Sequence, residues 1–123
     1  MAKGILIVDD NVVIRRSLRR ILESIGEWKI VGEAADGREG IEKARELQPD
    51  LIVLDLAMPV MNGLEAAREL NQIMPNVPLL MYSAFADKYM EKEAFSVGIK
   101  AVVSKASDME ALVRQARELL SAA

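Results

Sequence analysis

Four apolar runs in this sequence end in side chains that can do chemistry. The residues at these ends are Asp9, Asp10, Asp55, Ser83 and Lys105. Asp55 follows Leu51–Leu54, a run typical of a strand that is buried on both faces. Asp55 alone could be an ordinary turn residue, but the same arrangement at four run ends favours one shared site.

Three of these residues are acids, and they would crowd together if their runs formed neighbouring parallel strands. Such strands lie about 4.8 Å apart, and two carboxylates about 5 Å apart repel by roughly 3 kcal/mol at an effective dielectric near 20. The cluster of Asp9, Asp10 and Asp55 therefore needs a cation or a raised pKa. Because the sequence holds no histidine and no cysteine, the ligands are oxygens and the predicted ion is Mg²⁺.

Lys105 and Ser83 extend the predicted chemistry to a phosphoryl group. A metal ion and an ammonium group together stabilise the equatorial oxygens of such a group, and the Ser83 hydroxyl can donate a hydrogen bond to one of them. One carboxylate in such a site can itself accept the phosphoryl group as an acyl phosphate. Asp55 is the better placed acceptor, because Asp9 and Asp10 resemble a pair of metal ligands.

Apolar runs alternate with helical patterns along the whole chain. The predicted strands are Gly4–Val8, Trp28–Ala34, Leu51–Asp55, Val77–Tyr82 and Ile99–Ser104. The run Trp28–Ala34 alternates only weakly, which suits a strand at the edge of a sheet. Five strand and helix units in alternation predict a doubly wound α/β fold, a three-layer sandwich with a parallel sheet between two layers of helices.

Apolar residues three and four positions apart predict a helix after each strand. These helices are expected over 11–25, through Ile41 to Leu47, over 62–74, over 84–97 and over 107–121. The predicted capping pairs are Asp36 with Glu39, Asn62 with Glu65, and Ser107 with Glu110. The segment 84–97 shows no narrow apolar stripe, so its boundaries are the least well defined. The first helix is expected to carry a solvated face of arginines, with a docking surface as the alternative; its residues are Arg15, Arg16, Arg19 and Arg20.

Composition limits what the chain can be. Its 123 residues, of which 51% are apolar, suit a single domain over 1–123. The net charge of −3 lacks the basic excess of a nucleic-acid binder, so no direct contact with nucleic acid is expected. No apolar stretch approaches the length of a membrane span, about 18 residues, and the absence of cysteine fits a reducing compartment. We therefore expect a cytoplasmic protein without a membrane segment.

Over essentially its whole length the chain resembles the receiver domains of two-component response regulators. The segments that carry the resemblance are Ile5–Asp10, Asp55–Gly63, Tyr82–Ala84 and Gly98–Lys105. The resemblance implies a flavodoxin-like (CheY-like) strand order, 2-1-3-4-5. It also implies that Asp55 receives a phosphoryl group from the phosphohistidine of a sensor histidine kinase or a phosphotransfer protein. The missing histidine agrees with a receiver and not with a donor.

The resemblance further implies the metal ligands and the switch. The implied ligands of Mg²⁺ are Asp9, Asp10, Asp55 and the backbone carbonyl of Ala57, with Asp9 bound directly or through water. Ser83 and Lys105 would contact the phosphoryl group and change the surface around the fourth helix and fifth strand. Only self-phosphorylation and self-dephosphorylation are expected of such a domain, so no enzyme activity on an external substrate is predicted.

Two positions depart from the family pattern. Val102 stands where Tyr or Phe is usual, which predicts that switching runs through Ser83 and its adjacent loop alone. Ala106 stands where Pro is frequent, and a trans bond is predicted before it, because a cis bond before a non-proline residue costs about 3 kcal/mol.

Details of Val31–Gly37 and of the residues after Lys105 resemble receivers of the NarL/FixJ type. Those receivers normally precede a DNA-binding domain, and no such domain is present in this sequence. The chain is expected to be either a stand-alone receiver or the receiver portion of a longer regulator. The sequence leaves open whether the chain forms a homodimer.

Functions of other classes also stay open. A pseudo-receiver that binds partners without phosphorylation would not require the full set of five polar residues. A Mg²⁺-dependent phosphohydrolase with an aspartyl nucleophile would carry Asp-x-Asp after the first strand, and a nucleotide-binding fold would carry a glycine-rich turn there. The segment Asp9-Asp10-Asn11-Val12 offers neither arrangement.

Overall fold

The computed structural model describes residues 2–121, and over these residues five strands alternate with five helices. The strands are β1 (Lys3–Val8), β2 (Trp28–Ala34), β3 (Leu51–Leu54), β4 (Leu79–Ser83) and β5 (Ala101–Ser104). The helices are α1 (Val12–Ser24), α2 (Gly37–Leu47), α3 (Gly63–Ile73), α4 (Lys88–Ser96) and α5 (Met109–Ser121). Each predicted strand and helix is present, which confirms the α/β class.

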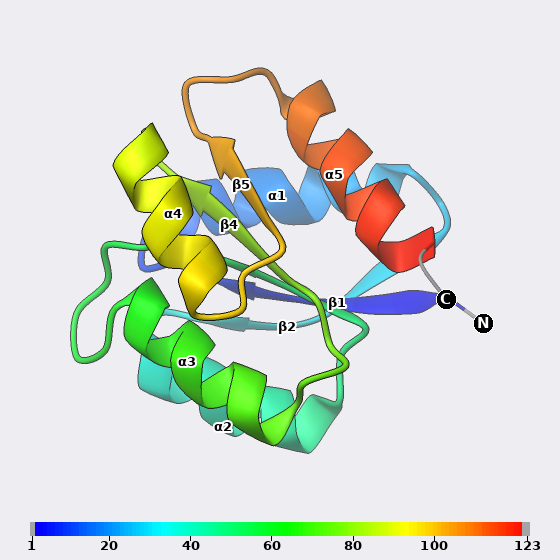
Figure 1. Ribbon diagram of the computed structural model, residues 1–123. Helices are drawn as coiled ribbons and strands as arrows, with labels where there is room; N and C mark the ends of the chain where they lie inside the picture. The colour runs from blue at the N-terminus through cyan, green and yellow to red at the C-terminus, as the bar shows by residue number, and fades with distance from the viewer. Residues whose placement is uncertain (1, 122–123) are drawn as a thin grey trace.

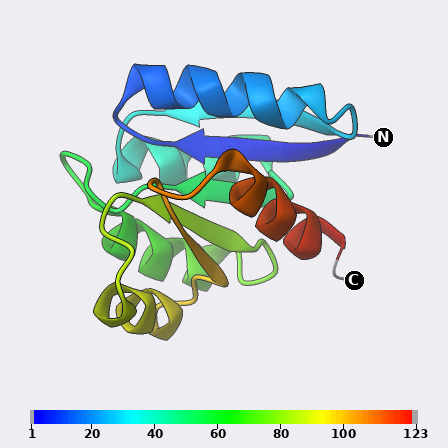
Figure 2. The same cartoon turned by 90° about the horizontal axis from the view of Figure 1, so that it is seen from above.

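The strands form one parallel sheet in the order β2-β1-β3-β4-β5. This is the predicted flavodoxin-like order, with β2 at an edge as expected and β3 in the centre. Val8 of β1 pairs with Leu54 of β3, so Asp9 and Asp55 follow side by side at the same end of the sheet. The view from above shows α1 beside β1 and α4 on the opposite side of the molecule, next to β5 (Figure 2).

Alternate residues of each strand point to opposite faces of the sheet, and this divides the apolar interior into two cores. Leu6 and Val8 belong to the core under α2, α3 and α4, whereas Ile5 and Ile7 belong to the core under α1 and α5. Figure 1 shows the same layers, with α2 and α3 below the sheet and α1 and α5 above it. Among residues 2–121, no helix combines the length and apolar character needed to cross a bilayer.

The helix caps follow the predictions in two of three cases. Asn62 and Glu65 form the complete reciprocal capping box. Asp36 accepts from the Glu39 amide as predicted, but the Glu39 carboxylate bonds to the amide of Ala35 instead of that of Asp36.

The predicted cap at Ser107 is wrong. The side chain of Asp108 accepts from the Ala111 amide at 3.1 Å, and α5 begins at Met109. Aspartate is at least as good a cap as serine, and the Ser107 amide is already committed to the carbonyl of Ser104.

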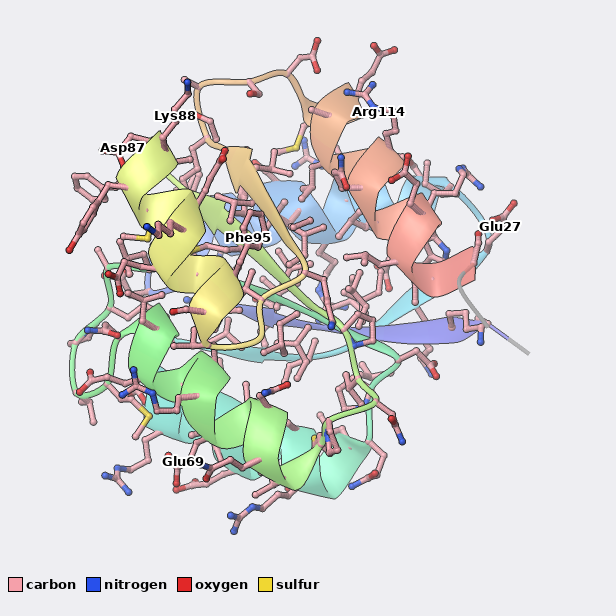
Figure 3. The ribbon with its side chains drawn as sticks, in the orientation of Figure 1. Glu27, Glu69, Asp87, Lys88, Phe95 and Arg114 are labelled. Carbon is pink, nitrogen blue, oxygen red and sulfur yellow. The ribbon has the colours of Figure 1, made fainter. Side chains whose placement is uncertain are left out.

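Boundaries differ most around α4. This helix begins at Lys88 instead of residue 84, because the Asp87 side chain caps it by accepting from the Met90 amide. Figure 3 labels Asp87 and Lys88 at this end of the helix and Phe95 further along it. The strands on either side, β4 and β5, each begin two residues later than predicted.

Candidate functional site

The ends of β1 and β3 bring three acids together, as the sequence predicted. One carboxylate oxygen from each of Asp9, Asp10 and Asp55 lies within 4.8 Å of the others. Asp9 and Asp55 are buried, with 2% and 6% of their surface exposed, whereas Asp10 is exposed. The cluster is therefore reached from solvent on the side of Asp10.

Lys105, which follows β5, bridges the two buried acids. Its Nζ lies 2.9 Å from Asp9 Oδ2 and 3.2 Å from Asp55 Oδ2. The Lys105 side chain is largely buried, so the chain is folded to place this ammonium group between the carboxylates. Three carboxylates and one ammonium group leave a formal charge of −2 when all are ionised.

Backbone amides hold the other oxygen of each buried acid. Asp9 Oδ1 accepts from the Asn11 amide at 2.9 Å, and Asp55 Oδ1 accepts from the Leu56 amide at 2.8 Å. Each carboxylate thus presents one oxygen to its own loop and the other to Lys105. This division fixes the orientation of both carboxylates relative to the ammonium group.

The environment shifts the pKa values of Asp55 and Lys105 upward for different reasons. Burial raises the pKa of Asp55, the charge of Asp9 raises it further, and Lys105 only partly opposes this. Burial alone would lower the pKa of Lys105, but Asp9 and Asp55 outweigh it and raise that pKa. Lys105 is therefore a permanent cation, while the ionised form of Asp55 still lacks full compensation.

Ser83 ends β4 and is fully buried. Its Oγ accepts from the Phe85 amide at 3.0 Å, and its carbonyl accepts from the Lys105 amide at 2.9 Å. The backbone bond joins Ser83 directly to the residue that carries the ammonium group. Because a hydroxyl can donate as well as accept, the side chain retains the chemistry that the sequence predicted for it.

Ala57 lies in the exposed loop between β3 and α3. The loop returns tightly to the strand, with the Gly63 amide donating to the carbonyl of Leu56 at 2.8 Å. A Cβ at Gly63 would meet the carbonyl oxygen of Asp55 at 2.1 Å. The loop therefore folds back against the backbone of Asp55, and the role of Ala57 as a carbonyl ligand stays a prediction.

The structure also shows the surroundings of Val102 and Ala106, the two residues that depart from the family pattern. Val102 is partly buried and packs against the core under α2, α3 and α4. The peptide bond between Lys105 and Ala106 is trans, as predicted.

Sequence reasoning missed two residues that support the cluster. Asn11 caps α1 by accepting from the amides of Val13 and Ile14, a role that its place before a helical pattern could have indicated. Arg15 donates from Nη1 to the carbonyl of Asp9 at 2.7 Å. The prediction that the arginines of α1 form a solvated face is wrong for Arg15, whose side chain is 17% exposed. No pattern in a single sequence indicates that Arg15 bonds to Asp9.

The donor set at this end of the sheet fits Mg²⁺. Hard oxygen ligands from a few carboxylates, open on one side to water, are what Mg²⁺ requires, and the excess negative charge favours a divalent cation. The buried ammonium group beside them suits an anionic oxygen. The donors present thus suit a divalent cation and an anionic oxygen.

Comparison with known proteins agrees with this geometry. The family model described as the response regulator receiver domain matches residues 5–117. The chain is 40% identical over 105 residues to the chemotaxis protein CheY of Thermotoga maritima, covering 85% of this chain and 87% of that protein. It spans about half the length of several other curated relatives.

Solved structures are similar over nearly the whole chain. A LuxR-family two-component response regulator from Aurantimonas has a TM-score of 0.94 at 31% identity, covering 98% of this chain and 86% of that one. The CheX–CheY–BeF3–Mg complex from Borrelia burgdorferi contains a chain with a TM-score of 0.92 at 26% identity, covering 98% of this chain and 90% of that one.

Proposed function

This chain belongs to the family of response regulator receiver domains, and from this membership we propose that it captures a phosphoryl group on Asp55. The observation that carries the proposal is the position of Lys105 Nζ between Asp9 and Asp55. An ammonium group held against two carboxylates beside an exposed third acid has the arrangement needed to receive phosphoryl oxygens. The domain then acts as a signalling switch in a two-component pathway.

Asp55 is the nucleophile in this proposal. A carboxylate oxygen of Asp55 attacks phosphorus, an O–P bond forms, and the P–N bond of the donor phosphohistidine breaks with its electron pair passing to the imidazole nitrogen. Lys105 pairs with a phosphoryl oxygen and Ser83 donates to another. The product is an acyl phosphate on Asp55.

Mg²⁺ is the proposed cofactor, held by Asp10, Asp55 and the carbonyl of Ala57, with Asp9 as a direct or water-mediated ligand. When bound, it supplies positive charge to the oxygens of the transferring group. The cluster of three carboxylate oxygens within 4.8 Å supports this assignment. So does the Borrelia burgdorferi complex, which contains BeF3 and Mg²⁺ together with CheX and CheY.

The proposed partners are a sensor histidine kinase or a phosphotransfer protein as donor, and an output protein or a further domain as receiver of the signal. The proposed route out of the site begins at Ser83, whose Oγ holds the Phe85 amide in the loop before α4. To donate to a phosphoryl oxygen, the Ser83 side chain turns toward it and moves Oγ away from the Phe85 amide, so the loop and α4 change. We place this activity in the cytoplasm, where such kinases present their phosphohistidine.

Intact-mass measurement tests the proposal. The chain is incubated with Mg²⁺ and acetyl phosphate, a small phosphodonor, and we expect a gain equal to one phosphoryl group. Asp55→Asn should abolish this gain, and Asp108→Asn should retain it, because Asn caps a helix as well as Asp does. A chain that never gains mass would instead be a pseudo-receiver, and steady hydrolysis of external phosphate esters would indicate a phosphohydrolase.

A further inference from the structure

Two arginines of α1 share one glutamate of β2. Arg15 Nε lies 3.0 Å from Glu33 Oε1, and Arg19 Nε lies 2.8 Å from Glu33 Oε2. Burial alone would raise the pKa of Glu33, but the hydrogen bonds and charges of Arg19 and Arg15 outweigh it and lower that pKa. Glu33 therefore stays ionised at neutral pH and holds both guanidinium groups.

Arg15 makes a further contact at the acid cluster. Its Nη1 donates to the backbone carbonyl of Asp9 at 2.7 Å. Over residues 2–121, Arg19 contacts the carboxylates of Glu33 and Glu23 and makes no bond to Asp9. The Arg15 side chain is 17% exposed against 40% for Arg19. The planar fork of Arg15 thus spans from β2 to the first acid of the cluster, which a single-point cation could not do.

The Asp9 carbonyl matters because it belongs to the peptide that leads into Asp10. A peptide unit is planar and includes the nitrogen and Cα of the next residue. A donor that fixes the Asp9 carbonyl therefore also fixes the position of the Asp10 Cα, from which the Asp10 side chain extends. The other polar groups of Asp9 are held separately, its amide by the Ala34 carbonyl and its carboxylate by the Asn11 amide and Lys105. Arg15 therefore supplies the restraint that orients the exposed acid.

We propose that Arg15, held in place by Glu33, is a positioning residue that fixes the peptide between Asp9 and Asp10 and thereby sets the affinity of the acid cluster for a divalent cation. The inference rests on the proposed function, because it concerns the same cluster. A simple tie between α1 and β2 is already provided by Arg19 and Glu33. The added bond from Arg15 to the Asp9 carbonyl is what assigns the positioning role.

Charge and position have opposite effects on cation binding, so they can be separated. The positive charge of Arg15 repels a cation, and its removal alone would tighten Mg²⁺ binding. Loss of positioning would weaken binding. Arg15→Lys keeps the charge but cannot hold Glu33 and the Asp9 carbonyl together, and Arg19→Lys is the matched control on the same glutamate.

Mg²⁺ titration followed by NMR tests the proposal without any phosphodonor. The amides of Asn11 and Leu56 report on the cluster, because they donate to the carboxylates of Asp9 and Asp55. We expect Arg15→Lys to weaken Mg²⁺ binding by about ten-fold, as outer-shell changes do, and Arg19→Lys to stay within about two-fold of the original chain. Equal effects of the two variants, or none, would overturn the proposal.

Two further variants keep the test decisive. Should Arg15→Lys lose its folded amide dispersion, Glu33→Gln leaves both arginines in place with one acceptor oxygen fewer. We expect about three-fold weaker binding, from the lost positioning together with the lost negative charge, and unchanged binding overturns the proposal. Arg15→Met must also weaken binding, since tighter binding would mean that only charge matters. Phosphorylation of the original chain is measured separately, so a failed phosphoacceptor role and a failed positioning role are distinguishable.

Discussion

At the scale of single residues, Asp55 combines two opposing requirements. It must be ionised to attack phosphorus, yet burial and the neighbouring charge of Asp9 raise its pKa. The sequence predicted the crowding of acids, because each acid follows an apolar run. The sequence also predicted the Lys105 ammonium group beside these acids, which the structure confirms. It could not predict that Lys105 would bridge Asp9 and Asp55 in particular, because that contact depends on the distances between three different strand ends.

This conflict predicts an unusual effect of Asp55→Asn on stability. The folded chain binds the Asp55 proton more tightly than the unfolded chain, so folding stability falls as pH rises from the ordinary Asp pKa of about 3.9 through the raised value. In metal-free buffer at neutral pH, we expect Asp55→Asn to raise the free energy of unfolding by an amount on the order of 1 kcal/mol.

Urea unfolding with a chelator present measures this difference. The gain should shrink as pH falls below about 4, where Asp55 is protonated in both states. Adding Mg²⁺ at neutral pH should also shrink it, since the cation stabilises the original chain more than the variant, which has one carboxylate ligand fewer. A variant that is less stable than the original chain in metal-free buffer at neutral pH would contradict this electrostatic account.

At the scale of elements, the loops that follow the strands position the chemistry. The sequence located Asp55 and the cap of α3 correctly, because Asn62 and Glu65 form a local pattern. It missed the caps of α4 and α5, since Asp87 and Asp108 compete with nearby polar residues for the same role and only the geometry selects one. It also could not show how closely the β3–α3 loop returns to the strand.

Gly63 is the residue on which that return depends. An added Cβ would lie 2.1 Å from the backbone oxygen of Asp55. The Asp55 backbone cannot move aside cheaply, because its amide is bonded to the carbonyl of Val8 in β1. We expect Gly63→Ala to lower the free energy of unfolding by about 3 kcal/mol or more.

Gly32→Ala is the matched control for Gly63→Ala. There the nearest atom is Leu47 Cδ1 at 2.6 Å, the end of a flexible side chain. We expect a loss below about 1 kcal/mol, because the leucine can rotate and alanine suits a strand better than glycine. Similar losses from both substitutions, measured by urea unfolding, would show that the loop does not press on Asp55.

At the scale of the whole molecule, the order of the strands determines which residues meet at the site. Alternating apolar runs and helical patterns were enough to predict the doubly wound class and its layers. This was possible because the spacing of apolar residues within a short segment indicates whether that segment forms a strand or a helix. The strand order and the pairing of Val8 with Leu54 set which acids become neighbours. The link from Arg15 to Glu33 and Asp9 lies outside such patterns, since it joins a helix, an edge strand and a loop.

The central claim is that these strand ends together form a single site for a phosphoryl group on Asp55. A crystal structure of the chain with Mg²⁺ and beryllium trifluoride, a mimic of the phosphoryl group, tests it most directly. We predict beryllium on a carboxylate oxygen of Asp55, Mg²⁺ on Asp10 and Asp55, and Lys105 Nζ on a fluorine. Beryllium trifluoride bound elsewhere, or Lys105 still bridging Asp9 and Asp55 without contacting it, would contradict the account.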